Sequence, residues 1–195
     1  MEPTPIEGDL CYLGIKKMKL SFSTIAIVLL FGVGILAIGR HLYFKPRFIH
    51  GEVAPDFKGT LPTGRVFQLT ELRGNYVLLD FWGSWCGPCR AQNPGLVALY
   101  AQHGARTFMD GAGFRIVSIG VERDPARWQQ AIMQDGLSWS YHLLDKSGSL
   151  HFFDGPIARL YKVRQVPTSF LINPEGKIMG VNPSMEEIDK MLSTR

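Results

Sequence analysis

The order of hydrophobic and polar positions divides this chain into one long apolar stretch and a segment of alternating short patterns. Residues 20–39 contain no charged side chain, and those that are not apolar are serine, threonine or glycine. A helix of this length rises about 30 Å, the thickness of the hydrocarbon core of a bilayer. A helix this long in a soluble domain normally has a polar face, and this one has none. The pattern predicts a single transmembrane helix at 20–39, between an N-terminal tail at 1–19 and a juxtamembrane linker at 40–50.

A cleaved signal peptide is the competing interpretation of residues 20–39. Its basic leader would be Lys16, Lys17 and Lys19, and its cleavage site would be 37–39. The apolar core of a secretory signal runs to ~7–15 residues, which is shorter than this stretch and favours the anchor. Three Lys or Arg residues lie in the tail and three in the linker, so the positive-inside rule assigns no orientation.

The remaining segment, residues 51–195, alternates between strand-like and helix-like patterns, which predicts an α/β domain. The nearly continuous apolar run at 76–82 is typical of a strand covered on both faces of its sheet. Asp124 and Ser184 are expected to cap helices at their N-termini, and Gly104 to end one. The other predicted elements are a β-hairpin at 52–64, strands at 114–121, 139–143, 168–172 and 177–180, and helices at 87–102, 125–136 and 156–163 and after 184.

Composition and charge then exclude several classes of protein. Of the 195 residues, 46% are apolar, which is too many for a disordered chain, and three cysteines are too few for a disulfide-built mini-protein. The net charge of +4 would hint at nucleic acid, but the surplus lies in residues 40–50, where bases meet lipid headgroups. Residues 51–195 are nearly neutral. We therefore expect membrane lipid around residues 20–39 and no nucleic-acid partner.

The stretch Trp85-Cys86-Gly87-Pro88-Cys89 carries the most specific chemistry. It lies where a predicted strand passes into a predicted helix, so Cys86 is at the helix N-terminus, where backbone N–H groups and the helix dipole favour a thiolate. Cys89, one turn later, is near enough to resolve a mixed disulfide. We expect an exposed Cys86 as the nucleophile, a buried Cys89 as the resolving thiol, and the redox-active disulfide between them in place of any cofactor.

Other uses of the cysteines are less consistent with the sequence. A zinc site needs four ligands, and no second Cys-x-x-Cys or close histidine pair is present, so no metal is expected. A purely structural disulfide across two residues would gain little loop entropy. The third cysteine, Cys11, precedes the apolar stretch rather than following it, so lipidation is not expected.

Over about residues 51–182 the chain resembles the thioredoxin superfamily, and specifically the membrane-anchored TlpA/ResA-type thiol–disulfide oxidoreductases. The resemblance implies a thioredoxin-like fold, in which helices flank a central mixed sheet that follows an N-terminal β-hairpin. The matching segments are 53–57, 72–75, 80–82, 85–89, 161–163, 166–172 and 175–178.

The resemblance also implies roles for single residues. Asp80 stands six residues before Cys86, where thioredoxins place a buried acid that accepts or relays the proton of the resolving cysteine. Pro167 matches the cis-proline that faces the cysteine pair. The residue before it, Val166, would offer backbone hydrogen bonds to an extended substrate, as in β-strand addition.

An apolar docking rim around the cysteines is implied as well, and it would consist of Trp85, Pro88, Val166 and Thr168. The chain departs from the resemblance at Gln92, where relatives of this type often carry a glutamate. Those relatives often lack the acid found here at the Asp80 position. We therefore expect proton handling closer to that of thioredoxin itself.

The leading interpretation is an anchored enzyme that reduces protein disulfides outside the cytoplasm, on cytochrome apoproteins or other proteins of the cell envelope. The Gly-Pro dipeptide between the cysteines is that of thioredoxin, whose potential of about −270 mV makes it a reductant. Because an outward-facing reductant must be re-reduced, an electron donor in the membrane is implied.

Two alternatives belong to other functional classes. A peroxidase of the peroxiredoxin branch shares the Ala-Pro-Asp-Phe opening at 54–57, but its motif needs a threonine where this chain has Gly83. A non-enzymatic, metal-carrying module would use the same fold. Such carriers usually add a histidine or alter the spacing of the cysteines, and this sequence does neither.

Overall fold

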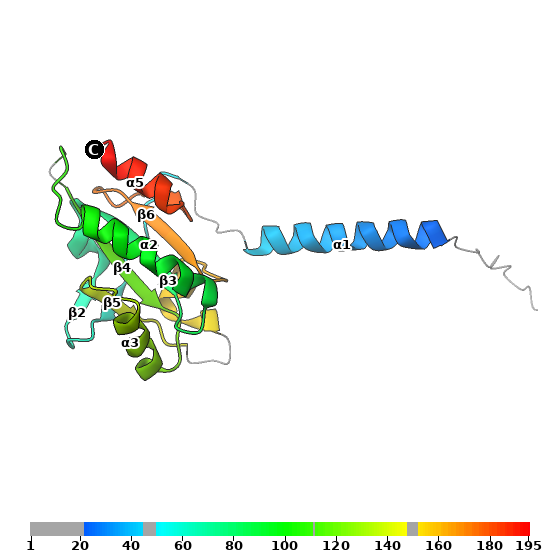
Figure 1. Cartoon of the computed structure of the whole chain (residues 1–195), viewed down its shortest axis with the longest axis horizontal. Coiled ribbons are helices and arrows are strands. Elements are labelled where there is room, and N and C mark those ends of the chain that lie inside the picture. Colours follow the sequence, from blue (N-terminus) through cyan, green and yellow to red (C-terminus); the bar gives the residue numbers. More distant parts are fainter. Residues whose placement is uncertain (1–21, 45–49, 111, 148–151) are drawn as a thin grey trace, which may run out of the picture. The chain divides into compact units, whose positions relative to one another are not determined.

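The computed structural model describes residues 22–44, 50–110, 112–147 and 152–195 (Figure 1). The chain divides into two compact units, Met1–Tyr43 and Phe44–Arg195.

The first unit is described through a single helix, α1 (Phe22–Phe44). Its segment Ser23–Arg40 is long and apolar enough to cross a membrane, judged by length and composition, and none of it is buried within the protein. The predicted span at 20–39 coincides with this helix from Phe22 onward. The predicted tail at 1–19, which includes Cys11, lies outside the described residues.

The second unit is built on a five-stranded mixed sheet with the strand order β5-β4-β3-β6-β7. The central strand β3 (Asn75–Trp82) pairs in parallel with β4 (Gly113–Gly120) and antiparallel with β6 (Thr168–Ile172). Strand β5 (Tyr141–Leu144) lies parallel to β4, and β7 (Ile178–Val181) lies antiparallel to β6. Every residue of β3 after the first is buried, as its apolar run predicted.

The predicted hairpin is present but lies later in the chain than expected. Its strands are β1 (Lys58–Thr60) and β2 (Val66–Gln68), which form a separate antiparallel pair. Gly59 is inside β1. A Cβ atom there would come within 2.8 Å of the Leu143 side chain, so the glycine allows close packing rather than a turn. In the described residues before β1, the strand-type pairing consists of one isolated antiparallel bridge between Val53 and Lys177.

Helices cover the sheet as the alternating pattern predicted. The described helices of this unit are α2 (Gly87–His103), α3 (Pro125–Gln134), α4 (Pro156–Leu160) and α5 (Met185–Ser193), with 3₁₀ turns η1 (Leu69–Leu72) and η2 (Phe152–Asp154). The predicted N-caps are confirmed. The Asp124 carboxylate accepts from the first N–H groups of α3, and Ser184 forms a capping box with Glu187. Gly104 does end α2, but in a right-handed rather than a left-handed conformation, with φ −63°.

The two faces of β3 contribute to two separate clusters of buried side chains. Leu79 and Phe81 point to the face covered by the hairpin and α4. Leu78 and Trp82 point to the face covered by α2, α3 and α5, and this second cluster contains both cysteines of the motif. Because side chains alternate along a strand, Asp80 shares the face of Leu78 and Trp82. Its carboxyl group is therefore on the cysteine side of the sheet.

Burial of His142 on β5 gives a testable pH dependence of stability. The ring stacks on Trp139 with centroids 5.5 Å apart, and its Nε2 lies 3.2 Å from the Leu137 carbonyl oxygen. Burial lowers the pKa of His142 to about 4 from 6.5. Between pH 6.5 and 4, His142 therefore binds a proton in the unfolded chain, whereas in the folded domain it stays neutral. This contribution to stability is complete above pH 6.5 and is lost as the pH falls toward 4, by up to about 3 kcal/mol.

Urea unfolding of the wild-type chain and of a His142→Phe variant, at pH 7 and pH 4.5, measures this effect. The variant changes the absolute stability, since it removes the hydrogen bond to Leu137, but it should lose less stability on acidification than the wild type. Equal losses in the two proteins would contradict the prediction.

Candidate active site

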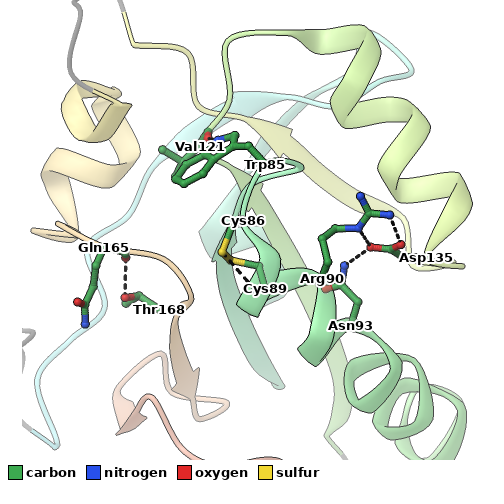
Figure 2. The surroundings of a disulfide bond; sticks show 9 residues. All are labelled: Trp85, Cys86, Cys89, Arg90, Asn93, Val121, Asp135, Gln165 and Thr168. Atoms are coloured by element: carbon green, nitrogen blue, oxygen red, sulfur yellow. Dashed lines mark hydrogen bonds and ion pairs between the residues drawn. A yellow bond between two sulfur atoms is a disulfide. The ribbon is translucent and has the colours of Figure 1, made fainter.

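Cys86 and Cys89 are joined by a disulfide at the point where β3 passes into α2 (Figure 2). The S–S distance is 2.08 Å and the Cα atoms are 5.3 Å apart. Cys86 is the N-cap residue of α2, and its sulfur accepts a hydrogen bond from the Cys89 backbone N–H at 3.2 Å. Pro88 lies in the first turn, where a missing N–H costs nothing. After reduction, the same N–H groups and the helix dipole would stabilise a thiolate on Cys86.

The expectation that Cys86 is exposed is wrong for the disulfide form. Cys86 is 4% exposed and Cys89 is 2% exposed, and both belong to the buried cluster under α2. The extended backbone of Cys86, with φ −88° and ψ 101°, turns its sulfur inward over the first turn of the helix, where it bonds to Cys89. The N-cap position, rather than exposure, therefore distinguishes the two sulfurs in this form.

Trp85 forms an exposed aromatic surface beside the disulfide. Its side chain is 46% exposed, and its indole Nε1 donates to the Val121 carbonyl oxygen at 3.0 Å (Figure 2). The ring packs on Phe152 with centroids 4.9 Å apart, and the guanidinium of Arg123 lies 4.3 Å from the centre of the Phe152 ring. Phe152 is half-buried and extends the Trp85 surface.

Gly83 is required by this placement of the indole. A Cβ atom at residue 83 would come within 2.6 Å of Trp85 Nε1. A threonine at this position, as the peroxiredoxin motif demands, is therefore incompatible with the observed orientation of Trp85. The alternative of a peroxidase loses support from this geometry.

The segment before β6 lies on the other side of the disulfide from Asp135 (Figure 2). The Val166–Pro167 peptide bond is cis, and both residues are half-buried. Thr168 differs from its expected role. Its side chain is 2% exposed, and its hydroxyl donates to the Gln165 carbonyl oxygen at 2.9 Å, so it contributes no surface to a docking rim. Trp85 and Pro88, which are exposed, and the half-buried Val166 remain available for such a rim.

Asp80 is a carboxyl group buried on the cysteine face of the sheet. It is 5% exposed, and its Oδ2 atom makes no hydrogen bond within the described part of the chain. Burial raises the pKa of Asp80 to about 7 from 3.8. Near neutral pH this group therefore exists in both protonation states, which is the property that a proton acceptor and donor needs.

A polar network fixes the start of α2 to the end of α3, and sequence reasoning missed it. The guanidinium of Arg90 holds the Asp135 carboxylate through two nitrogens, with Nη2 and Oδ1 2.5 Å apart (Figure 2). Asn93, which is 1% exposed, donates to the same carboxylate at 2.5 Å. The pair raises the pKa of Arg90. No local pattern announces these contacts, because Asp135 is 45 residues away from Arg90 in sequence.

The described residues contain no group of three or more His, Cys, Asp or Glu side chains that could hold a metal ion.

The fold and the paired cysteines define the class as a thioredoxin-like thiol–disulfide oxidoreductase, and comparisons with known proteins agree. The thioredoxin domain of a thiol-disulfide oxidoreductase from Bacteroides vulgatus superposes with a TM-score of 0.63 at 26% identity, covering 74% of this chain and 99% of that one. A thiol-disulfide oxidoreductase from Bacteroides fragilis NCTC 9343 gives a TM-score of 0.62 at 28% identity, covering 73% and 98%. The expected thioredoxin-like fold is confirmed.

The chain belongs to the AhpC/TSA family, whose model matches residues 50–181. It is similar to the thiol-disulfide oxidoreductase ResA of Bacillus thuringiensis (strain Al Hakam), with 30% identity over 169 residues that cover 84% of this chain and 87% of that protein. ResA of Bacillus subtilis (strain 168) is 29% identical over 167 residues, covering 85% and 86%. The resemblance stated from the motifs is thereby confirmed, and the protein is an oxidoreductase acting on thiols and disulfides.

Proposed function

We propose that this protein is a membrane-anchored reductase of protein disulfides that acts outside the cytoplasm through the Cys86–Cys89 pair. The observation that supports it most strongly is the disulfide at the N-cap of α2, beside the exposed indole of Trp85. A thiol at this position is activated by the helix, and its partner is already within bonding distance.

In the proposed reaction the reduced protein gives two electrons to its substrate. The Cys86 thiolate attacks one sulfur of a substrate disulfide, forms a mixed disulfide and releases the first substrate thiolate. Cys89 then loses its proton to the Asp80 carboxylate and attacks Cys86 Sγ. The Cys86–Cys89 disulfide forms, the second substrate thiolate leaves, and Asp80 retains the proton.

The substrate is expected to lie along the surface formed by Trp85, Pro88 and Val166. An extended substrate segment would pair with the backbone of Val166, next to Pro167, by β-strand addition. Proteins that carry exposed disulfides are the substrate class, and apocytochromes with paired haem-binding cysteines are one group within it.

Electrons are proposed to flow from this protein to its substrates, and the catalytic domain is proposed to lie outside the cytoplasm. The Gly-Pro dipeptide between the cysteines is that of a reductant, and a donor in the membrane would restore the dithiol. Helix α1 would hold the enzyme at the bilayer, with lipid around its apolar side chains. Protein disulfides persist in oxidising compartments outside the cytoplasm, so the catalytic domain would face that side.

The direction of catalysis can be tested with the full chain in detergent micelles. We expect it to accelerate the reduction of insulin disulfides by a dithiol and to equilibrate with glutathione at a potential nearer to about −270 mV than to the about −120 mV of a strong oxidant. Faster oxidation of a reduced peptide, with no acceleration of insulin reduction, would contradict a reductase. Hydroperoxide consumption or stoichiometric copper binding without insulin reduction would favour the two alternatives.

A further inference from the structure

A cleft of about 320 Å³ leads to Asp80 between α2 and the segment that joins β7 to α5. Its floor includes Asp80 and Leu96, which are both buried. Its mouth is formed by three exposed polar residues, Gln92 on α2 and Asn182 and Ser184 before α5. The cleft therefore joins a buried carboxyl group to the surface through polar side chains.

The floor of the cleft has the polarity that water requires. Asp80 Oδ2 is buried and lacks a partner among the described residues. Ser169, which lines the same cleft, stands directly opposite Asp80 in the antiparallel pairing of β3 and β6, so both side chains lie on one face of the sheet. A cavity holds water when it exceeds about 10–15 Å³ and offers two to four polar partners, and this cleft satisfies both conditions.

The residues at the mouth of the cleft differ from those that form the expected docking surface. That surface consists of Trp85, Pro88 and Val166, and none of the three lines the cleft. Pro167 lines the cleft and adjoins the docking surface, so the two regions are neighbours. A protein bound over Cys86 can thus leave the mouth open to solvent.

We propose that this cleft is the route by which Asp80 exchanges its proton with solvent while substrate covers the cysteines. The inference rests on the proposed role of Asp80 as the acceptor of the Cys89 proton. When Cys89 attacks Cys86 Sγ, the proton moves to the Asp80 carboxylate and the electron pair of the broken bond leaves with the substrate thiolate. A protonated Asp80 must first deliver its proton to water in the cleft before it can accept that of Cys89, so a blocked cleft prolongs the mixed disulfide. Asp80 releases the accepted proton by the same route, and Gln92 is a positioning residue at the mouth.

The test measures the lifetime of the mixed disulfide. The reduced full chain is mixed with a peptide disulfide at pH 7, and acid-quenched samples are analysed by mass spectrometry. A Gln92→Phe variant, which narrows the mouth from an exposed helix position, should lengthen this lifetime about tenfold, less than the ~10²–10⁴-fold that positioned proton transfer contributes, because the mouth is narrowed rather than closed. The rate at which the mixed disulfide forms should not change. Ser169→Val, which removes a hydroxyl beside Asp80, should act in the same direction.

Gln129→Phe is the matched control, because Gln129 is exposed on α3 and does not line the cleft. It should leave the lifetime unchanged. In an Asp80→Asn background, where the acceptor is gone, Gln92→Phe should add no further delay. A full tenfold delay in that background would show a steric effect, and an unchanged lifetime in both cleft variants would also overturn the route. If Asp80→Asn alone leaves the lifetime unchanged, the proposed role of Asp80 fails first, and the route with it.

Discussion

A Cys89→Ser variant is expected to accumulate as a mixed disulfide on Cys86 with its protein substrates. The reason is the position of the two residues on α2. Cys86 is the N-cap, where the helix favours the thiolate, and Cys89 supplies the thiol that releases the substrate. Without Cys89 the first attack still occurs, but the resolving step does not. Turnover should fall by at least about 10³-fold, as it does when a member of a catalytic unit is removed.

The trapping experiment is best made with the full chain in membranes. A Cys11→Ser background leaves Cys86 and Cys89, so the trapping variant keeps Cys86 as its single cysteine. Adducts are recovered under non-reducing conditions and the modified residue is located by peptide mapping. The matched control is Cys86→Ser, which keeps Cys89 but should capture little. Equal capture by the two variants would contradict the assignment of Cys86 as the nucleophile.

An Asp80→Asn variant is expected to be more stable than the wild type above pH 7, by up to about 4 kcal/mol. The buried carboxyl group has its pKa raised to about 7, whereas the unfolded chain ionises near 3.8. The folded domain therefore holds a proton that the unfolded chain releases between these values. The wild type loses stability as the pH rises from about 4 through 7, and the amide variant is spared this loss.

The comparison needs urea unfolding of the oxidised chain at pH 5, 6, 7 and 8, with the difference between variant and wild type taken at each pH. Taking the difference cancels the opposite contribution of His142, which is common to both proteins. Glu186→Gln is the control, since it neutralises an exposed acid on α5. A difference that stays constant from pH 5 to pH 8 would show that burial of Asp80 does not govern its ionisation.

Elements decided by burial or local capping could be predicted from the sequence. The run at 76–82 is apolar because β3 is covered on both faces, and Asp124 and Ser184 cap their helices through contacts only a few residues long. Strand β5 begins at Tyr141, two residues later than predicted. Trp139 lies outside the strand, buried, with its indole donating to the Ser118 hydroxyl at 3.0 Å.

Features that depend on contacts between segments distant in sequence could not be predicted from local patterns. Two such contacts are the ring packing of Phe152 on Trp85 and the hydrogen bonds from Arg90 to Asp135. Both join segments that are far apart in sequence, so no local pattern predicts them. The burial of Thr168 likewise follows from its position at the start of a central strand. The cis bond before Pro167 came from the family resemblance alone, because only about 5–6% of X–Pro bonds in folded proteins are cis.

Helix α2 is held at both of its ends. At its start, Arg90 and Asn93 donate hydrogen bonds to the Asp135 carboxylate. At its end, Nε2 of the buried His103 lies 2.7 Å from the Asp189 carboxylate of α5. These contacts do not involve sulfur, so opening the disulfide does not itself remove them. We therefore expect the helix to hold both thiols in place, with little reorganisation of the backbone around them in each catalytic cycle.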